Sequence, residues 1–233
     1  MTHHRRSVLV TGASRGIGRA IAVDLGRDHH VLVGGTDPST VAEVVAALPD
    51  AEPFVVDLAD AGATEAAARR VEALDALVNC AGIASSGSGR IDQTSRDQWR
   101  EVLELNVVAV ADLTRLLLPL LRRSHGDVVM VNSGSGFLRP GPGGGVYAAS
   151  KYAMRALTHA LREEERGVVR VSSVHPGRVD TDMQVDLQRR AGRDYHPEDH
   201  LRPESVAAAV RLALEAGPDA IVEEVSVRPV NRI

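Results

Sequence analysis

The chain has 233 residues, which at roughly 150 residues per domain predicts one large domain rather than two. Hydrophobic residues make up 44% of the chain and charged residues 25%, which is enough apolar material for a packed core and excludes a disordered protein. The net charge is −4, and aromatic residues are only 3%, so the composition argues against a nucleic-acid-binding protein.

The residues that could form disulfides, bind metals or enter a membrane are few or badly spaced. Cys80 is the only cysteine, which excludes an intramolecular disulfide and a cysteine-based metal cluster. Among the nine histidines, His3-His4 and His29-His30 are adjacent pairs that cannot face one ligand together, so we expect no metal site. No apolar run is long enough for a membrane span or a signal peptide. We therefore expect a cytoplasmic protein whose partner is a small molecule.

Short apolar runs rich in β-branched residues alternate with longer segments of helical period. This rhythm predicts βαβ units and a parallel sheet, and so the α/β class. The predicted strands cover residues 8–10, 31–33, 54–56, 76–78, 128–131, 169–174 and 221–227. The predicted helices begin with one that presents Ile17, Ala20, Ile21 and Leu25 on one face, and continue at 38–48, 61–72, 96–123, 147–165 and 203–215.

Two segments break this rhythm. Residues 134–145 are rich in glycine, and residues 183–202 are polar without a clear period. Long irregular insertions in a compact domain are often functional loops, so we expect both to border the site and 183–202 to form a substrate lid. Phe137, Leu138 and Met183 are candidates for the apolar wall of a substrate pocket.

The first predicted strand runs into Thr11-Gly-Ala-Ser-Arg-Gly-Ile-Gly18, which opens the first helix. Glycines at such a junction let the backbone turn tightly and approach a ligand, while free N–H groups and the helix dipole favour a pyrophosphate. A glycine triplet alone could be an ordinary turn, but its place after the first strand favours phosphate binding.

A second cluster places Tyr147 and Lys151 one helical turn apart on the same face. Lys151 is the only lysine in the chain, which favours a chosen point charge over a surface cation. A nearby cation stabilises a phenolate and makes tyrosine a usable proton donor or acceptor. Ser133 follows the fifth predicted strand, at the sheet edge where α/β folds bind ligands, and Ser135 is the alternative hydroxyl.

Together these residues resemble the short-chain dehydrogenases/reductases, in the compact single-domain branch of that family. The resemblance covers essentially the whole chain in the correct order. The matching elements are Thr11-Gly-x3-Gly-x-Gly18, Asn79-Cys80-Ala81-Gly82, Asn106, the Ser133 region, Tyr147-x3-Lys151, and Pro176-Gly177 with Thr181. The family usually has a second asparagine where this chain has Cys80, which we interpret as a small buried residue rather than a reactive thiol.

The resemblance implies an oxidoreductase that interconverts a ketone or aldehyde and an alcohol by hydride transfer with a nicotinamide cofactor. Tyr147 would be the general acid and base, and Ser133 would hydrogen-bond the substrate oxygen. Lys151 would bind the nicotinamide ribose and support Tyr147. Asn106 would hold a water of the proton relay.

The same resemblance implies the cofactor site and the architecture. The residues expected to bind the cofactor besides Tyr147 and Lys151 are Gly12, Ser14, Arg15, Gly16, Ile17, Gly18, Thr36, Asp57, Leu58, Asn79, Ala81, Gly82, Pro176, Gly177, Val179 and Thr181. The fold would be a Rossmann-type doubly wound parallel sheet, ordered 3-2-1-4-5-6-7, with helices on both faces. Residues 1–233 would form one domain, and the protein would be a homo-oligomer, either a tetramer or a dimer, built on 96–123 and 147–165.

The choice between NADP(H) and NAD(H) depends on the end of the second strand. An acid there takes the ribose 2′-hydroxyl of NAD, whereas a cation takes the 2′-phosphate of NADP. The strand ends Val33-Gly34-Gly35-Thr36 with neither, and Asp37-Pro38 fits the start of a helix better. Arg15 supplies a cation, so we favour NADP(H) and keep NAD(H) as the alternative.

Three further hypotheses remain. A catalytically idle dinucleotide-binding sensor or scaffold would need only the phosphate loop, so the intact set of Tyr147, Lys151, Ser133 and Asn106 argues against it. Epimerisation or dehydration on the same fold is disfavoured because the chain has no room for a separate substrate domain. Arg178, Arg189, Arg190 and Arg193 could attract an acidic substrate, although a solvated surface is the commoner explanation for such a group.

Overall fold

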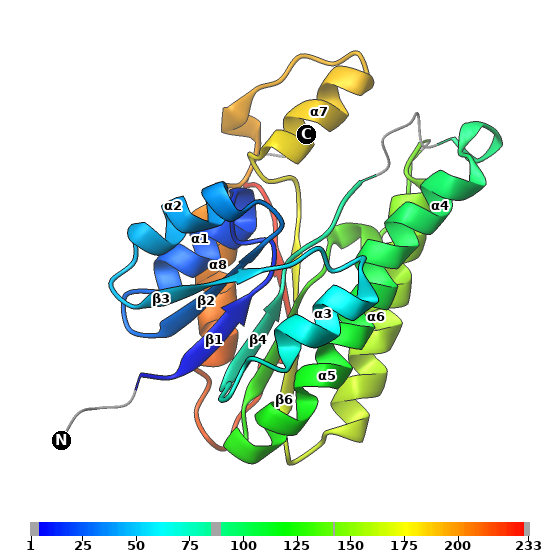
Figure 1. Ribbon diagram of the computed structural model, residues 1–233. Helices are drawn as coiled ribbons and strands as arrows, with labels where there is room; N and C mark the ends of the chain where they lie inside the picture. The colour runs from blue at the N-terminus through cyan, green and yellow to red at the C-terminus, as the bar shows by residue number, and fades with distance from the viewer. Residues whose placement is uncertain (1–4, 85–89, 142, 231–233) are drawn as a thin grey trace.

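The strands in the computed structural model, which describes residues 5–84, 90–141 and 143–230, form one parallel sheet (Figure 1). Its order is β3-β2-β1-β4-β5-β6-β7, which confirms the predicted order. The strands are β1 (Ser7–Val10), β2 (His30–Gly35), β3 (Ala51–Val55), β4 (Ala76–Asn79), β5 (Asp127–Val131), β6 (Arg170–Pro176) and β7 (Glu224–Val227). The class is therefore α/β with a doubly wound, Rossmann-type sheet.

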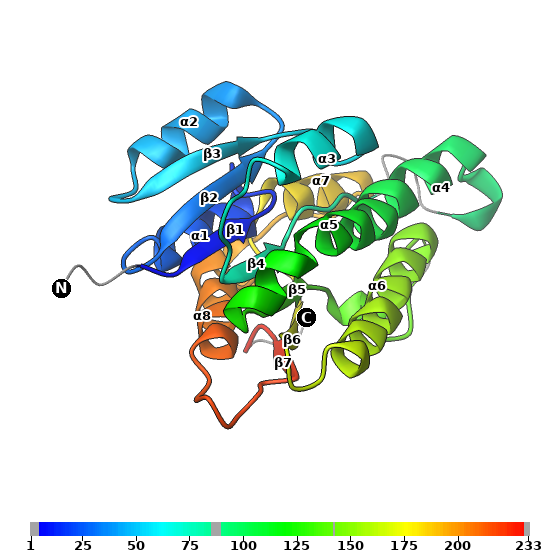
Figure 2. The ribbon, with the colours of Figure 1, turned by 60° about the horizontal axis from the view of Figure 1, so that its bottom comes forward.

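Helices cover both faces of the sheet (Figures 1 and 2). One core lies between the strands and α1 (Gly16–Leu25), α2 (Pro38–Ala46) and α8 (Pro203–Leu214). The other lies beneath α3 (Ala61–Ala68), α5 (Ala109–Ser124) and α6 (Gly145–Glu164). Within β1, Val8 and Val10 enter the first core and Leu9 the second, so each of these strand residues is buried. This explains why the strands are continuous apolar runs.

The segment predicted as one helix over 96–123 contains a change of helical pitch. It consists of α4 (Arg96–Leu103), a π-helical turn at Glu104–Val108, and α5. A π-helical turn inside an α-helix often marks a functional position, and here it holds the buried Asn106. Hydrophobic periodicity cannot show this turn, because the flanking helices keep their apolar faces on the core.

The expectation of an irregular segment at 183–202 is wrong in its first half. Asp182–Arg190 forms α7, which lies at the top of Figure 1, away from the two helical layers. The remainder contains a short 3-10 turn, Pro197–Asp199, and Leu201, which forms an isolated parallel β-bridge with Val179. The helical period was hard to recognise because Met183 and Leu187 line a cavity instead of packing on the core.

A buried ion-pair cluster ties the lower end of the sheet together. The carboxylate of Asp127, whose side chain is only 3% exposed, accepts hydrogen bonds from Arg170 Nε at 2.7 Å and from Arg6 Nη2 at 2.6 Å. Arg170 also donates to the carbonyl oxygen of Ala216, at the end of the α8 segment. A buried carboxylate is costly when it loses its cationic partner, so this cluster should matter for stability.

We expect Arg170→Met to lower the free energy of unfolding by about 2–4 kcal/mol, because it leaves Asp127 buried with Arg6 alone. Urea unfolding followed by circular dichroism measures the change. The matched control is Arg166→Met, which breaks an exposed pair with Glu163 and should leave the unfolding midpoint nearly unchanged. Equal destabilisation by the two substitutions would contradict the role of burial.

Candidate active site

The site lies where the order of the sheet reverses, between β1 and β4. The chain leaves these two neighbouring strands in opposite directions, so an opening forms at their carboxyl ends. The hydroxyl of Thr11 bridges the two segments, because its Oγ1 accepts hydrogen bonds from the N–H groups of Cys80 at 2.9 Å and Ala81 at 3.0 Å. The reversal of strand order therefore leaves an opening whose two sides are held together by Thr11.

The glycines that follow Thr11 form a tight turn in which a side chain would collide with the neighbouring backbone. Gly12 and Gly16 have φ values of 64° and 53°, in the left-handed region. A Cβ at Gly12 would lie 2.9 Å from the Cα of Ala81, and one at Gly18 would lie 2.2 Å from the carbonyl oxygen of Gly12. This close-packed turn leads into the N-terminus of α1, so it fits the pyrophosphate of a dinucleotide.

A cavity of about 300 Å³ extends from this loop. Most of the residues predicted to bind a cofactor line it, namely Gly12, Ser14, Arg15, Gly16, Ile17, Gly18, Thr36, Asp57, Leu58, Ala81, Gly82, Tyr147, Lys151 and Thr181. The segments that follow β1 and β4 thus meet residues of β2 and α6 around one space, although they are far apart in the sequence. The residues present fit a nicotinamide dinucleotide.

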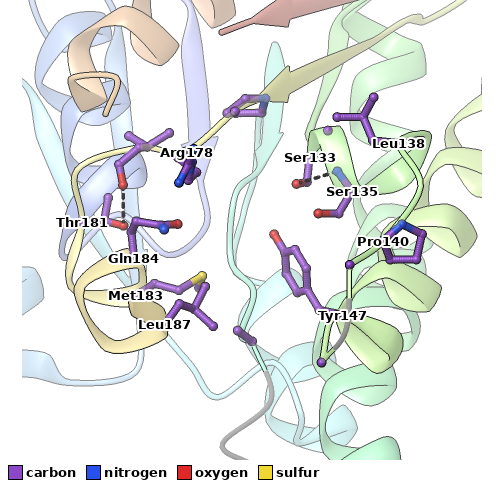
Figure 3. Close-up of a pocket in the computed structure, with 18 of the residues that line it drawn as sticks. Ser133, Ser135, Leu138, Pro140, Tyr147, Arg178, Thr181, Met183, Gln184 and Leu187 are labelled. Carbon is purple, nitrogen blue, oxygen red and sulfur yellow. Dashed lines mark hydrogen bonds between the residues drawn. The ribbon is translucent and has the colours of Figure 1, made fainter. Parts of the chain in front are cut away.

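A larger cavity of about 890 Å³ adjoins it (Figure 3). Its lining includes Ser133, Ser135 and Leu138 on one side and Met183 and Leu187 of α7 on the other (Figure 3). The predicted cofactor residues Pro176, Gly177 and Val179 lie here, together with Ile17, Tyr147 and Thr181, which line both cavities. Leu138 and Met183, predicted as wall residues of a substrate pocket, both line this cavity.

Three predicted residues lie elsewhere. Asn79 is buried outside both cavities, and its Nδ2 donates to Thr114 Oγ1 at 3.1 Å. Phe137 does not line the larger cavity, because its ring packs against the edge of the His175 ring, with centroids 5.1 Å apart. Asn106 also lines neither cavity.

The side chain of Asn106 holds the segment that follows β4. Its Oδ1 accepts from the N–H of Ile83 at 2.8 Å, while its Nδ2 donates to the carbonyl oxygen of Ile83 at 2.9 Å and to Ser150 Oγ at 3.0 Å. Because Gly82 and Ile83 line the smaller cavity, Asn106 positions part of that wall.

Tyr147 and Lys151 project from α6 as the spacing predicted. The Nζ of Lys151 lies 5.8 Å from the centroid of the Tyr147 ring and donates to the carbonyl oxygen of Val131 at 3.3 Å. Lys151 is only 4% exposed, although it still lines the smaller cavity. Tyr147 and Lys151 therefore both reach the wall of the smaller cavity from one face of α6.

The backbone of Ser133 is held by a hydrogen bond from a buried histidine. Ser133 Oγ accepts from the N–H of Ser135 at 3.1 Å, and His175 Nδ1 donates to the carbonyl oxygen of Ser133 at 3.2 Å. His175 is fully buried on β6, with its Nε2 3.9 Å from Glu224 Oε1. Burial lowers the pKa of His175, which keeps the imidazole neutral.

Sequence reasoning missed two polar residues of the larger cavity. Asn132 lines both cavities and is 4% exposed, and neither its Nδ2 nor its Oδ1 has a hydrogen-bond partner within the described residues. Because Asn132 lies between a buried strand and Ser133, its sequence position could have indicated a place in the site. Arg228 also lines the cavity, but it follows the last strand, where the sequence carries no motif.

Two interpretations of single residues agree with the structure. Asp37 caps α2, accepting at Oδ1 from the N–H of Ser39 at 2.8 Å, and it does not line the smaller cavity. Cys80 is partly buried against the first core, and desolvation raises the pKa of its thiol to about 12, which makes it a poor nucleophile.

The described residues contain no group of three histidine, cysteine, aspartate or glutamate side chains that could hold a metal ion. A search of the same residues also finds no helix long and apolar enough to cross a membrane.

Comparison with known proteins places the chain in a family. A family model described as short chain dehydrogenase matches residues 6–192. An uncharacterized short-chain type dehydrogenase/reductase from Sinorhizobium fredii is 32% identical, over 97% of this chain and 92% of the relative. An NADP-dependent 3-hydroxy acid dehydrogenase from Schizosaccharomyces pombe is 28% identical, over 97% and 93%.

A solved structure agrees with these matches. An alcohol dehydrogenase from the archaeon Thermococcus sibiricus, complexed with 5-hydroxy-NADP, superimposes with a TM-score of 0.87 at 28% identity and covers 98% of each chain. The chain belongs to the short-chain dehydrogenases/reductases. It is an oxidoreductase of the class that acts on CH–OH and C=O groups with NAD or NADP.

The buried neutral His175 predicts a pH-dependent stability. Because its pKa is lower in the folded protein, the folded state resists protonation while the unfolded chain binds a proton as the pH falls below about 6.5. The contribution is therefore present above that pH and is lost as the pH falls. We expect the loss of unfolding free energy between pH 7.5 and 5.5 to be smaller by about 1 kcal/mol in His175→Asn. Urea unfolding at both pH values measures it, and parallel losses in the two proteins would contradict this role.

Proposed function

We propose that the protein reduces a ketone or aldehyde to an alcohol with NADP(H), and catalyses the reverse oxidation, with Tyr147 as the general acid and base. The observation that carries this proposal is the position of Tyr147, which lines both cavities. Its hydroxyl is directed toward the side of the larger cavity that holds Ser133 (Figure 3). A substrate in that cavity can therefore meet a proton donor at the boundary with the cofactor cavity.

The roles of the side chains follow from these positions. In reduction the Tyr147 hydroxyl gives its proton to the carbonyl oxygen, while the Ser133 hydroxyl donates a hydrogen bond to the same oxygen and stabilises its developing charge. The bound dinucleotide supplies or accepts the hydride. Lys151 supports the phenolate left on Tyr147 through its charge. Asn106 holds the segment where a water could return a proton.

Replacing Tyr147 with phenylalanine tests the proton transfer. We expect Tyr147→Phe to lower kcat by about 10²- to 10⁴-fold, because the ring keeps its shape but loses the proton. Consumption of reduced cofactor across a panel of ketones and aldehydes measures the change. The matched control is Tyr152→Phe, an exposed tyrosine on the same helix, which should retain activity. Equal turnover by Tyr147→Phe and the unmodified protein would contradict the assignment.

The preference for NADP(H) over NAD(H) rests on charge around the end of β2. Asp37 is engaged in capping α2, and Gly34, Gly35 and Thr36 line the cavity without a negative charge. Arg15 lines the same cavity, with its side chain 77% exposed and its Nη1 3.6 Å from Asp182 Oδ2. A 2′-phosphate could compete with Asp182 for this guanidinium. The names of the fission yeast relative and the archaeal structure also mention NADP.

We expect Arg15→Ala to weaken binding of NADPH by about 10-fold or more and to leave binding of NADH within about twofold, since only NADPH carries the 2′-phosphate. Fluorescence titration with both cofactors measures the two dissociation constants. Arg19→Ala serves as a control in the first turn of α1, the helix that Arg15 precedes, because Arg19 does not line the cavity. An equal loss for both cofactors would remove the 2′-phosphate role from Arg15.

The remaining expectations complete the proposal. Residues 1–233 act as one domain, and 183–202 forms a lid whose helix α7 faces the larger cavity with Met183 and Leu187. A homo-oligomer and a cytoplasmic location stay predictions from the family resemblance and the composition. The alternative of an idle dinucleotide-binding sensor or scaffold is disfavoured, because such a protein would not need Ser133 and Tyr147 on a second cavity.

A further inference from the structure

The larger cavity carries positive charge that the proposed hydride and proton transfers do not use. Its lining contains four arginines, Arg139, Arg178, Arg190 and Arg228, and among the described lining residues there is no aspartate or glutamate. A cleft lined by one sign of charge concentrates ligands of the opposite sign. The cavity therefore favours an anion.

Arg228 is held in place by several contacts. Its Nη1 donates to the carbonyl oxygen of His175 at 2.6 Å and to that of Val227 at 3.1 Å. Its guanidinium carbon lies 5.4 Å from the centroid of the Phe137 ring, a cation–π contact. These contacts fix the guanidinium before a ligand arrives, which lowers the entropic cost of binding.

Two glycines make room for the Arg228 side chain. A Cβ at Gly177 would lie 3.3 Å from Arg228 Cδ, and a Cβ at Gly134 would lie 2.9 Å from Arg228 Nη2. Gly134 directly follows Ser133, the residue proposed to hydrogen-bond the substrate oxygen. The guanidinium is thus held against the Ser133 segment, so an anion bound to it would lie within a few bonds of the reacting carbonyl.

No carboxylate within the described parts of the chain neutralises Arg228. Arg155 also packs on the Phe137 ring, at 5.5 Å, but it pairs with Glu224 at 3.4 Å. Burial lowers the pKa of Arg228, which is the effect of lost hydration without an acidic partner in return. A half-buried cation of this kind is stabilised when a ligand brings the opposite charge.

The cofactor does not supply that charge. The phosphate-binding glycines Gly12, Gly16 and Gly18 line the smaller cavity, and neither Arg228 nor Arg178 belongs to its lining. Among the arginines near the lid, Arg189 and Arg190 both pair with Asp186, at 2.6 Å and 3.4 Å, and Arg193 lines neither cavity, so they do not account for an anion site.

We propose that Arg228, assisted by Arg178, binds a carboxylate of the substrate, so that the substrate is a short oxo acid and the product the corresponding hydroxy acid. This inference rests on the proposed function and names its substrate class. The planar guanidinium matches a carboxylate with two N–H donors. Arg178 lies on the neighbouring segment, because the N–H of Gly177 donates to the carbonyl oxygen of Val227 at 2.7 Å, and its side chain lines the same cavity (Figure 3).

A pair of substrates that differ in charge tests the carboxylate site. With NADPH, kcat/KM is measured for acetoacetate and for its neutral methyl ester, in the unmodified protein, Arg228→Gln and Arg178→Gln. We expect the ratio of the two kcat/KM values to fall by about 10- to 100-fold in Arg228→Gln and less in Arg178→Gln, with ester turnover retained. Arg155→Gln is the matched control, because it also removes a cation from Phe137 but does not line the cavity. An unchanged ratio in Arg228→Gln would overturn the inference.

Binding to the protein saturated with NADP⁺ separates this inference from the proposed function, because a ketone cannot be reduced in that complex. Calorimetric titration should show acetoacetate binding at least tenfold more tightly than its ester, and this preference should disappear in Arg228→Gln. If acetoacetate binds in this way but neither substrate is reduced in the assay with NADPH, the anion site would be sustained and the reductase function refuted. If the ester is reduced with NADPH and acetoacetate is not bound in preference to it, the reductase function would be supported and the carboxylate site refuted. A preference for dihydroxyacetone phosphate over dihydroxyacetone, with none for acetoacetate, would assign the arginines to phosphate and overturn the carboxylate.

Discussion

The reversal of strand order between β1 and β4 is the constraint on which the rest of the structure depends. All the strands are parallel, so their carboxyl ends meet at one edge, and the reversal keeps that edge open. Thr11 braces the opening by accepting hydrogen bonds from both residues that follow Asn79. The glycine loop, Ser133 and the segment after β6 all begin at this edge. Their convergence is a property of the sheet.

Buried polar groups hold the edge in shape. Asn106 fixes Ile83, His175 fixes the carbonyl of Ser133, and Lys151 donates to the carbonyl of Val131. In each case a side chain from one element bonds to the backbone of the last strand residue or of the segment that follows the strand. Because an unpaired buried polar group is costly, these contacts resist displacement and hold the walls of the two cavities in place. Preorganised donors of this kind lower the cost of reorganisation during a reaction.

Positive charge is found in both cavities of the site, and Tyr147 lies at the boundary between them. The smaller cavity has the N-terminus of α1 and Arg15, while the larger has Arg178 and Arg228. The overall net charge of −4 conceals this local concentration of cations. In the functions proposed above, the cofactor and an anionic substrate would be held by separate arginines, so neither would have to displace the other from its binding site.

The sequence by itself determined the class, the glycine loop and the pair of Tyr147 and Lys151, because local spacing and periodicity carry those signals. The strand order followed from the family resemblance that these motifs carry. The sequence also indicated that Asp37 caps a helix. It could not show the π-helical turn at Asn106, the helix α7, the burial of Asn79 away from both cavities, or Arg228 between Gly134 and Gly177. Those features depend on contacts between residues distant in the chain, and only the packed sheet brings those residues together.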